Sequence, residues 1–322
     1  MKDFPHLVFY GTPEFAVPSL RAIVEAGYPV QAVVTAPDRP AGRGLRLLST
    51  PVKEFARSKN LPVLEPVNLR DPAFLGTLRE LNPDLQVVIA FRMMPREVWS
   101  LPRLGTFNLH ASLLPQYRGA APINRAVMNG ETDTGLTTFL LDERIDTGRI
   151  LLQERVSIGG EETAGELHDR MMLQGSELVL KTIGRILQGE RGTPQESMTE
   201  GGIELRKAPK IFREDCRIDW KGDTLRIHNF IRGLSPVPAA WTQLHSHDGA
   251  IHTLKILRAL PGFPEGAGIP GTFRIMGKDT LTITTGNGCI YVRELQLSGR
   301  KPLNSVDFVS GYGRIFPETL CL

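Results

Sequence analysis

The chain has few cysteines, and they are not spaced to cross-link a fold or to bind a metal. Only three occur in 322 residues: Cys216, Cys289 and Cys321. Their number is odd, they lie far apart, and none forms a Cys-x-x-Cys pair, so we predict neither a disulfide framework nor a zinc site. A chain of this length can bury a core without such links, and we expect a reducing, cytoplasmic environment.

The chain also lacks a long hydrophobic run. No stretch approaches the roughly 18 apolar residues that a membrane-spanning helix needs. The first six residues, Met1 to His6, contain no apolar core of a signal peptide. These absences predict a soluble protein with no membrane partner, and the length predicts two domains of ordinary size.

A strong excess of charge of one sign is absent from the chain as a whole but present in its C-terminal part. The formal net charge is +3 at pH 7. Residues 1–204 contain 22 basic and 25 acidic residues, whereas residues 205–322 contain 16 and 10. The resulting excess of +6 suits a polyanionic partner for the C-terminal part, although a merely soluble domain can carry the same charge.

Residues 1–204 alternate between strand and helix patterns. Residues 85–90 form an almost unbroken apolar run, as is typical of strands covered by helices on both faces. A capping box from Thr163 to Glu166 predicts the start of a long helix that reaches about Leu187. The alternation predicts an α/β fold with a doubly wound, mostly parallel, Rossmann-like sheet. The other expected strands are 7–10, 30–35 and 62–64, and the other expected helices are 18–26, one from residue 50, and 71–81.

From residue 205 the pattern changes. One short helix is expected over 223–231, and turn signals such as Asn287-Gly288 separate short strand-like runs. Five short strands in about 100 residues predict an OB-like β-barrel, a common nucleic-acid-binding fold. We therefore expect two domains, 1–204 and 205–322. The expected strands are 240–244, 253–257, 271–275, 281–285 and 290–295.

Asn108 and His110, at the end of an expected strand, are the strongest candidates for a functional site. Side chains alternate along a strand, so these two point the same way. In a doubly wound sheet, ligands bind beyond the carboxyl ends of the strands. The alternative is that Asn108 caps the strand and His110 is a satisfied interior histidine, and for an isolated pair that would be the better hypothesis. Position at a strand end makes the two interpretations about equal.

Asp146 adds a carboxylate to this carboxamide and imidazole, and no candidate nucleophile accompanies them. Such a set suits direct acyl transfer, in which an amine attacks a carbonyl carbon. Asn108, and His110 if protonated, would stabilise the oxyanion, and Asp146 would accept the proton of the amine, directly or through water.

Three arginines lie on a loop rich in glycine and proline: Arg39, Arg43 and Arg46. Guanidinium groups on such a loop suit contact with phosphates, and Gly42 and Gly44 would let it approach a nucleic-acid groove. A mobile, solvated surface loop is the alternative, which the residues alone favour. The two glycines lack the third glycine of a dinucleotide fingerprint, so no nicotinamide cofactor is expected.

Three histidines lie near the Asp248-Gly249 turn: His245, His247 and His252. A His-x-His pair can bind a metal, but here it flanks a probable hairpin and has no supporting cysteine cluster. We expect no functional metal.

Several motifs together resemble the folate-dependent formyltransferases. They are Asn108-x-His110, Ser112-Leu113-Leu114-Pro115, Arg118-Gly119 and Asp146-Thr147-Gly148. The resemblance covers nearly the whole chain when the comparison is with the branch of the family that formylates an aminoacyl transfer RNA. Residues 11–16, 37–44, 208–211, 218–220 and 230–236 carry that wider resemblance.

This resemblance implies transfer of a formyl group from 10-formyltetrahydrofolate, the donor co-substrate, to the amino group of methionyl initiator tRNA. It implies no metal and no obligate protein partner. Arg43 would be the most direct contact to the RNA. The implied sets are Asn108, His110 and Asp146 for catalysis; Ser112, Leu113, Leu114 and Pro115 for folate; and Arg39, Arg43, Arg46, Lys207 and Lys210 for tRNA.

One segment departs from the family pattern. Relatives usually carry a Tyr-Gly pair after the strand that ends near Ala90, whereas this chain has Phe91-Arg92-Met93-Met94-Pro95. If that segment borders the pterin pocket, as the resemblance implies, Arg92 and the two methionines change its walls.

Three other functions stay open. The acceptor could be an amino-sugar nucleotide or a purine precursor, although neither needs both a basic C-terminal domain and an arginine loop. A hydrolase would pass the formyl group to water. An RNA-binding protein with an inactive formyltransferase domain would not need the intact set of Asn108, His110 and Asp146.

Overall fold

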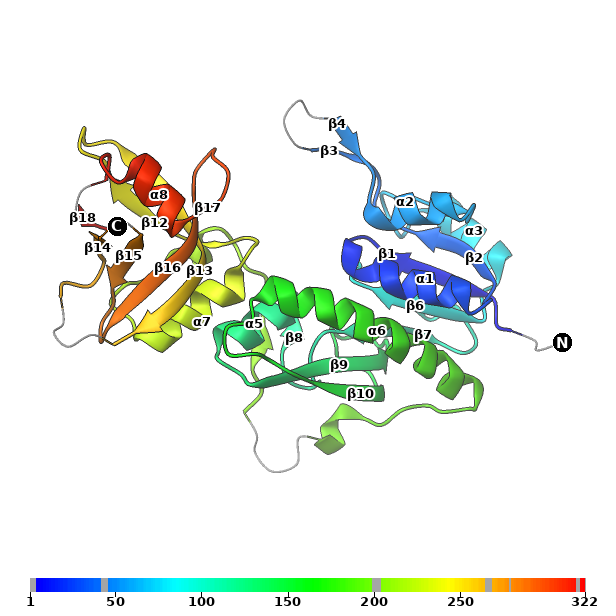
Figure 1. Ribbon diagram of the computed structural model, residues 1–322. Helices are drawn as coiled ribbons and strands as arrows, with labels where there is room; N and C mark the ends of the chain where they lie inside the picture. The colour runs from blue at the N-terminus through cyan, green and yellow to red at the C-terminus, as the bar shows by residue number, and fades with distance from the viewer. Residues whose placement is uncertain are drawn as a thin grey trace. The chain divides into compact units, whose positions relative to one another are not determined.

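The chain folds into two compact units in the computed structural model (Figure 1). The first unit contains residues 1–119, 135–156 and 168–207, and the second contains 120–134, 157–167 and 208–322. The units are therefore interleaved along the chain. The structure describes residues 4–41, 46–198, 204–263, 268–277, 279–316 and 319–321, with the backbone alone for 41, 46, 319 and 320.

The first unit is built on a seven-stranded sheet with the strand order β10-β9-β7-β6-β1-β2-β5. Neighbouring strands from β7 to β5 are parallel, and β9 pairs antiparallel with β7. The predicted α/β class with a mostly parallel sheet is confirmed. The strands are β1 (Leu7–Gly11), β2 (Val30–Val34), β5 (Val63–Leu64), β6 (Leu85–Ile89), β7 (Thr106–His110), β9 (Asp133–Leu140) and β10 (Ile150–Ser157).

The helices of this unit begin where the local sequence directs them to begin. Thr50 accepts a hydrogen bond from the backbone of Lys53, and Asp71 accepts one from Ala73, so each side chain caps a helix that starts with proline. The helical elements are η1 (Glu14–Ala16), α1 (Val17–Glu25), α2 (Pro51–Ser58), α3 (Pro72–Leu81), α4 (Arg96–Trp99) and η2 (Gln195–Met198).

Helix α6 (Ala164–Leu187) begins at the predicted capping box. Thr163 Oγ1 accepts from the Glu166 amide at 3.2 Å, and Glu166 Oε2 accepts from the Thr163 amide at 2.9 Å. Both contacts satisfy backbone donors that have no partner inside the helix. The first four residues of α6 belong to the second unit and the remainder to the first.

The second unit contains an antiparallel sheet with the order β12-β13-β16-β15-β14-β18, and β17 pairs with β16. The sheet is curled into a half-barrel, which confirms the predicted class of the C-terminal part. Register shifts in β13 between Ile256 and Ala259 give the sheet extra twist. The strands are β12 (Ala240–His245), β13 (Ile251–Gly262), β14 (Thr272–Met276), β15 (Thr280–Thr284), β16 (Cys289–Leu297), β17 (Leu303–Asn304) and β18 (Thr319–Leu320).

Helices cover the half-barrel and close its core. Helix α7 (Thr224–Leu234) is capped by Asp223 and packs on β13, and α8 (Ser305–Tyr312) packs on β15 and β16. Helix α5 (Pro122–Met128) packs on α7 so closely that a Cβ at Gly233 would lie 2.5 Å from the Met128 side chain. The remaining short elements are β3 (Arg39–Ala41), β4 (Arg46–Leu48), β8 (Arg118–Gly119), β11 (Lys207–Ala208) and η3 (Glu214–Cys216).

Candidate functional site

Asn108 and His110 lie on β7 at the carboxyl end of the parallel part of the sheet. Asn108 pairs with Val88 on one side and with Phe139 on the other, so its backbone is fixed by the sheet. Its side chain is partly exposed, whereas His110 is only 7% exposed. The predicted placement at a strand end is therefore what the structure shows, and the pair presents one accessible amide beside one buried imidazole.

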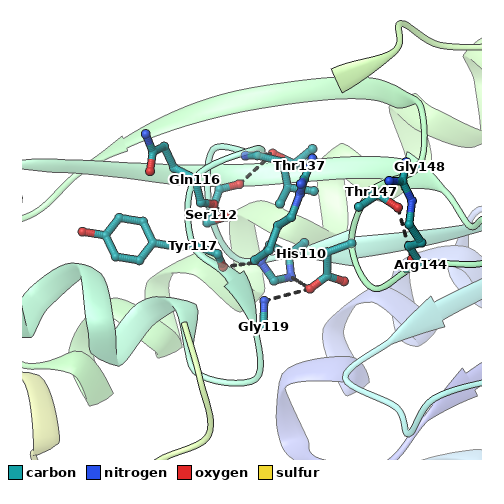
Figure 2. Close-up of polar contacts among 12 residues, drawn as sticks. His110, Ser112, Gln116, Tyr117, Gly119, Thr137, Arg144, Thr147 and Gly148 are labelled. Carbon is teal, nitrogen blue, oxygen red and sulfur yellow. Dashed lines mark hydrogen bonds and ion pairs between the residues drawn. The ribbon is translucent and has the colours of Figure 1, made fainter. Parts of the chain in front are cut away.

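The imidazole of His110 contacts groups through both of its nitrogens (Figure 2). Nε2 lies 3.0 Å from the carbonyl oxygen of Tyr117. Because a carbonyl only accepts, Nε2 carries a hydrogen and donates it. Nδ1 lies 3.9 Å from Asp146 Oδ2, which is an ion-pair distance but too long for a hydrogen bond. Nδ1 therefore faces the carboxylate without being saturated by it.

Asp146 is held by its backbone and by one side-chain contact. Its Oδ2 accepts a hydrogen bond from the Gly119 amide at 2.9 Å. Its backbone has φ = 55°, in the left-handed region, which non-glycine residues adopt only where surrounding contacts compensate the cost. These contacts aim one carboxylate oxygen of Asp146 at the imidazole of His110. The three residues predicted for catalysis lie in one unit, and two of them, His110 and Asp146, face each other.

Gln195 supports the loop between β9 and β10, which contains Asp146 and is called the Asp146 loop below. No pattern in the sequence indicated this role of Gln195. Its buried side chain donates from Nε2 to the carbonyl oxygens of Asp146 at 3.0 Å and Gly148 at 2.8 Å. Its Oε1 accepts from Arg118 Nη2 at 2.6 Å. Gln195 thus connects the loop after β9 to the loop after β7. Sequence patterns could not indicate these contacts, because the segments that Gln195 joins are distant in sequence.

Gly148 lets this loop pass close to β9. A Cβ at Gly148 would lie 1.6 Å from the carbonyl oxygen of Leu140, a distance that no side chain tolerates. Thr147 reinforces the turn by donating to Asp142 Oδ1 at 2.8 Å. Geometry therefore explains two positions of the Asp146-Thr147-Gly148 motif, namely Thr147 and Gly148.

The loop predicted to bind folate, Ser112 to Pro115, is anchored firmly. Ser112 is fully buried, and its hydroxyl donates to the Gln116 carbonyl at 2.6 Å. Thr137, which the sequence analysis missed, donates to the Ser112 carbonyl at 2.6 Å and accepts from the Leu114 amide at 3.1 Å. Leu114 is buried as well, so the partly exposed members of the loop are Leu113 and Pro115.

A pocket of about 540 Å³ lies in the first unit, beside the segment that departs from the family pattern. Arg92 closes one side of it by donating from Nη1 to the Val67 carbonyl at 2.7 Å and from Nη2 to the Pro66 carbonyl. Burial, and then the charge of Arg39, lower the pKa of the Arg92 guanidinium. The lining residues are 67–70, 92–96, Trp99 and Glu143.

The basic residues predicted to bind tRNA are only partly described. Arg39 is exposed at the start of β3, which pairs antiparallel with β4 so that the expected loop is a short hairpin. Arg43 lies outside the described residues, and Arg46 is described by its backbone alone. Lys207, in the first unit, is exposed. Lys210, in the second, is also exposed, and its ammonium lies 5.4 Å from the ring centre of Phe212.

Of the three histidines near the Asp248-Gly249 turn, His252 is used in packing. His252 Nε2 lies 3.1 Å from Ser246 Oγ, and its ring meets Phe316 edge-on. In the part of the chain that the structure describes, no group of three or more His, Cys, Asp or Glu side chains could hold a metal ion. No described helix is both long and apolar enough to cross a membrane.

Comparison with known proteins gives matches along the whole chain. Residues 6–183 match the formyl transferase family, and residues 210–313 match the formyl transferase C-terminal domain. The methionyl-tRNA formyltransferase of Parabacteroides distasonis is 48% identical over 321 residues, which cover 99% of both chains. That of Phocaeicola vulgatus is 51% identical over 308 residues, which cover 95% of both chains.

Two solved structures share the fold at low sequence identity. HypX from Aquifex aeolicus, in complex with tetrahydrofolic acid, has a TM-score of 0.61 at 18% identity. The match covers 96% of this chain and 47% of HypX, so this chain spans about half the length of that protein. An N-formyltransferase from Helicobacter canadensis, bound to folinic acid and dTDP-3-aminofucose, has a TM-score of 0.62 at 23% identity and covers 89% of this chain and 98% of its own.

Proposed function

The chain belongs to the methionyl-tRNA formyltransferase family, and we propose that Asn108, His110 and Asp146 carry out its reaction. The enzyme transfers the formyl group of 10-formyltetrahydrofolate to the free amino group of methionyl-tRNA. One observation above all supports the assignment of these residues. The Asp146 carboxylate, fixed by the Gly119 amide, faces the imidazole of a histidine two residues after Asn108 on the same strand.

The reaction needs a hydrogen-bond donor at the formyl oxygen and an acceptor for the proton of the amine. The amine attacks the formyl carbon, and the carbonyl oxygen becomes an oxyanion in the tetrahedral intermediate. Collapse of that intermediate breaks the bond to N10 of the folate, which takes up a proton as it leaves. The partly exposed amide of Asn108 donates to the developing oxyanion, where such a donor is most effective.

His110 and Asp146 divide the remaining tasks. Because Nε2 is occupied by the Tyr117 carbonyl, Nδ1 is the nitrogen available to the reaction. When protonated, Nδ1 lies 3.9 Å from the Asp146 carboxylate, too far for a hydrogen bond, so its hydrogen stays available to the oxyanion. Asp146 stabilises this imidazolium and accepts the proton that the amine loses, directly or through one water molecule.

The folate co-substrate binds beside this set. We assign the pocket of about 540 Å³ to part of the folate molecule, because it adjoins the segment after β6 and includes Glu143 from the Asp146 loop. Leu113 and Pro115 supply apolar contact from the Ser112 to Pro115 loop, while buried Ser112 and Leu114 maintain its shape. The chemistry of the lining residues requires no metal.

The acceptor is the initiator form of methionyl-tRNA, held by basic side chains. We assign phosphate contacts to Arg39, which is exposed at the start of β3, and to Arg43 and Arg46, which follow it in the sequence; Lys207 and Lys210 add further contacts. Along the sequence, we assign catalysis to residues 1–204 and RNA binding to residues 205–322, a division that differs from the interleaved compact units. No obligate protein partner is needed, and the cytoplasm, where translation begins, is the expected location.

Single-turnover transfer from labelled 10-formyltetrahydrofolate tests this function. The acceptors are charged initiator methionyl-tRNA, the same RNA uncharged, and none. We expect label on the charged RNA alone. Release of labelled formate in all three reactions would identify a hydrolase, and the absence of any reaction would overturn the proposal.

A further inference from the structure

The β3–β4 hairpin consists, in the described part of the chain, of two paired strands, residues 39–41 and 46–48. Each strand contains three residues. Leu47 is 69% and Leu48 is 56% exposed, so these apolar side chains do not pack the hairpin against the unit. A two-stranded hairpin of this size is marginal in water on its own. The direction in which it extends must therefore be set at its base.

The base of the hairpin is closed by polar contacts among buried or half-buried groups. Thr35 and Thr50, which flank the hairpin in the sequence, share a hydrogen bond of 2.8 Å between their hydroxyl groups. Asp38, the residue before β3, lies 2.8 Å from the ammonium of Lys53. Lys53 lies in the first turn of α2 and is only 3% exposed.

Lys53 makes a second ion pair from the same ammonium group. Its Nζ donates to Glu65 Oε1 at 2.7 Å, and Glu65 follows β5 of the sheet. The pairing with Asp38, followed by that with Glu65, raises the pKa of Lys53. The pairing with Lys53 lowers the pKa of Asp38. One buried cation thus ties the base of the hairpin to α2 and to the segment after β5.

We propose that Lys53 is a positioning residue for the acceptor RNA: it holds Asp38, and through Asp38 the basic hairpin, in the direction that the RNA requires. This inference rests on the proposed function, in which Arg39 and its neighbours contact tRNA. Lys53 itself is only 3% exposed, so it would act on the RNA indirectly. Its effect passes through the backbone between Asp38 and Arg39.

Asp38→Asn gives the sharpest test, because two mechanisms predict opposite results. Removal of a negative charge beside a basic hairpin strengthens RNA binding if only long-range electrostatics matter. Loss of the ion pair to Lys53 weakens it if the hairpin is positioned from its base. We expect the KM for methionyl-tRNA to rise about three- to ten-fold, as for other directly coupled groups, with kcat and the KM for folate nearly unchanged.

Lys53→Met, with Arg103→Met as its matched control, gives the second measurement. Both substitutions remove one positive charge from the first unit. Arg103 Nε lies 2.6 Å from Asp84 Oδ1, and neither residue belongs to the hairpin or to its base. We expect a larger rise in the KM for tRNA with Lys53→Met than with Arg103→Met. If Lys53→Met does not fold, Asp38→Asn decides alone, since Asp38 is partly exposed.

Arg39→Ala separates failure of this inference from failure of the proposed function. If Arg39→Ala raises the KM for tRNA while Asp38→Asn lowers it or leaves it unchanged, the hairpin binds RNA but Lys53 does not position it. If Arg39→Ala also has no effect, the RNA contact itself is wrong and the inference falls with it.

Discussion

At the scale of single residues, a backbone carbonyl determines how the site can work. The Tyr117 carbonyl accepts from His110 Nε2 and so leaves Nδ1 to face Asp146. Tyr117 has φ = 60°, in the left-handed region that non-glycine residues rarely adopt. A histidine free to rotate would present either nitrogen. Here the loop selects one, which is a form of preorganisation.

Asn108→Ala should reduce turnover without unfolding the protein. The substitution removes the proposed donor to the oxyanion, and loss of one such donor costs about a hundred-fold in kcat. The side chain is partly exposed, so the melting temperature should change little. Single-turnover formyl transfer and thermal unfolding measure the two effects. A rise in either KM with unchanged kcat would contradict the role given to Asn108.

Gln195→Leu should lower kcat through Asp146. It removes the two hydrogen bonds to the Asp146 and Gly148 carbonyls while it roughly preserves the side-chain volume. A small displacement of a catalytic group costs about ten-fold or more in rate. Gln195→Glu, which keeps the acceptor for Arg118 but loses the donors, should behave alike. If both variants retain full kcat, Gln195 does not position the loop.

At the scale of elements, Arg92 attaches the segment after β6 to the segment after β5. Arg92 donates to the carbonyls of Pro66 and Val67, and these residues adjoin Glu65, the partner of Lys53. The pocket wall therefore depends on a contact between two loops that follow different strands of the same sheet. A change in either loop is therefore expected to alter the shape of that wall.

Arg92→Met should weaken folate binding and leave tRNA binding intact. Methionine keeps part of the aliphatic volume but cannot donate to the two carbonyls, so the wall of the pocket loosens. We expect the KM for 10-formyltetrahydrofolate to rise about five-fold, the effect of roughly 1 kcal/mol of lost hydrogen bonding. Arg96→Met, at an exposed lining position with an ion pair to Glu143, is the control for charge. Equal effects of the two variants would show that charge alone matters.

At the scale of the whole molecule, stability depends on pH through groups in both units. The pKa of Asp84 is lowered by the His6 amide, and that of Glu166 is lowered first by Arg258. Burial, followed by the charge of Arg232, lowers the pKa of His228. For all three groups the folded pKa lies below the unfolded one. The unfolded chain therefore binds more protons, and stability falls as pH falls.

Urea unfolding at several pH values should show two phases of this loss. The midpoint should begin to decrease below about pH 6.5, where an unfolded histidine takes up a proton, and more steeply below about pH 4.5, where unfolded carboxyls do. His228→Gln, which cannot titrate, should flatten the first phase and leave the second. An increase in the midpoint between pH 7 and pH 5 would contradict the sign of these shifts.

The sequence by itself determined the features that depend on neighbouring residues. The capping box from Thr163 to Glu166 sets the start of α6 because its two contacts span three positions. The apolar run that became β6 is buried on both faces, and the alternation of such runs with helices determined the α/β class. The spacing of Asn108 and His110 in a strand determined that both would reach the same edge.

Only the tertiary structure decided which distant groups meet. It brought Gln195 to the Asp146 loop, Thr137 to the loop after β7, and Lys53 between Asp38 and Glu65. It also showed that buried Ser112 shapes its loop from within. None of the contacts made by Gln195, Thr137 and Lys53 leaves a periodic or local pattern, because each joins segments that the packing of the sheet and its loops brings together. The sequence therefore identified the chemical groups of the site, and the fold determined which residues they contact.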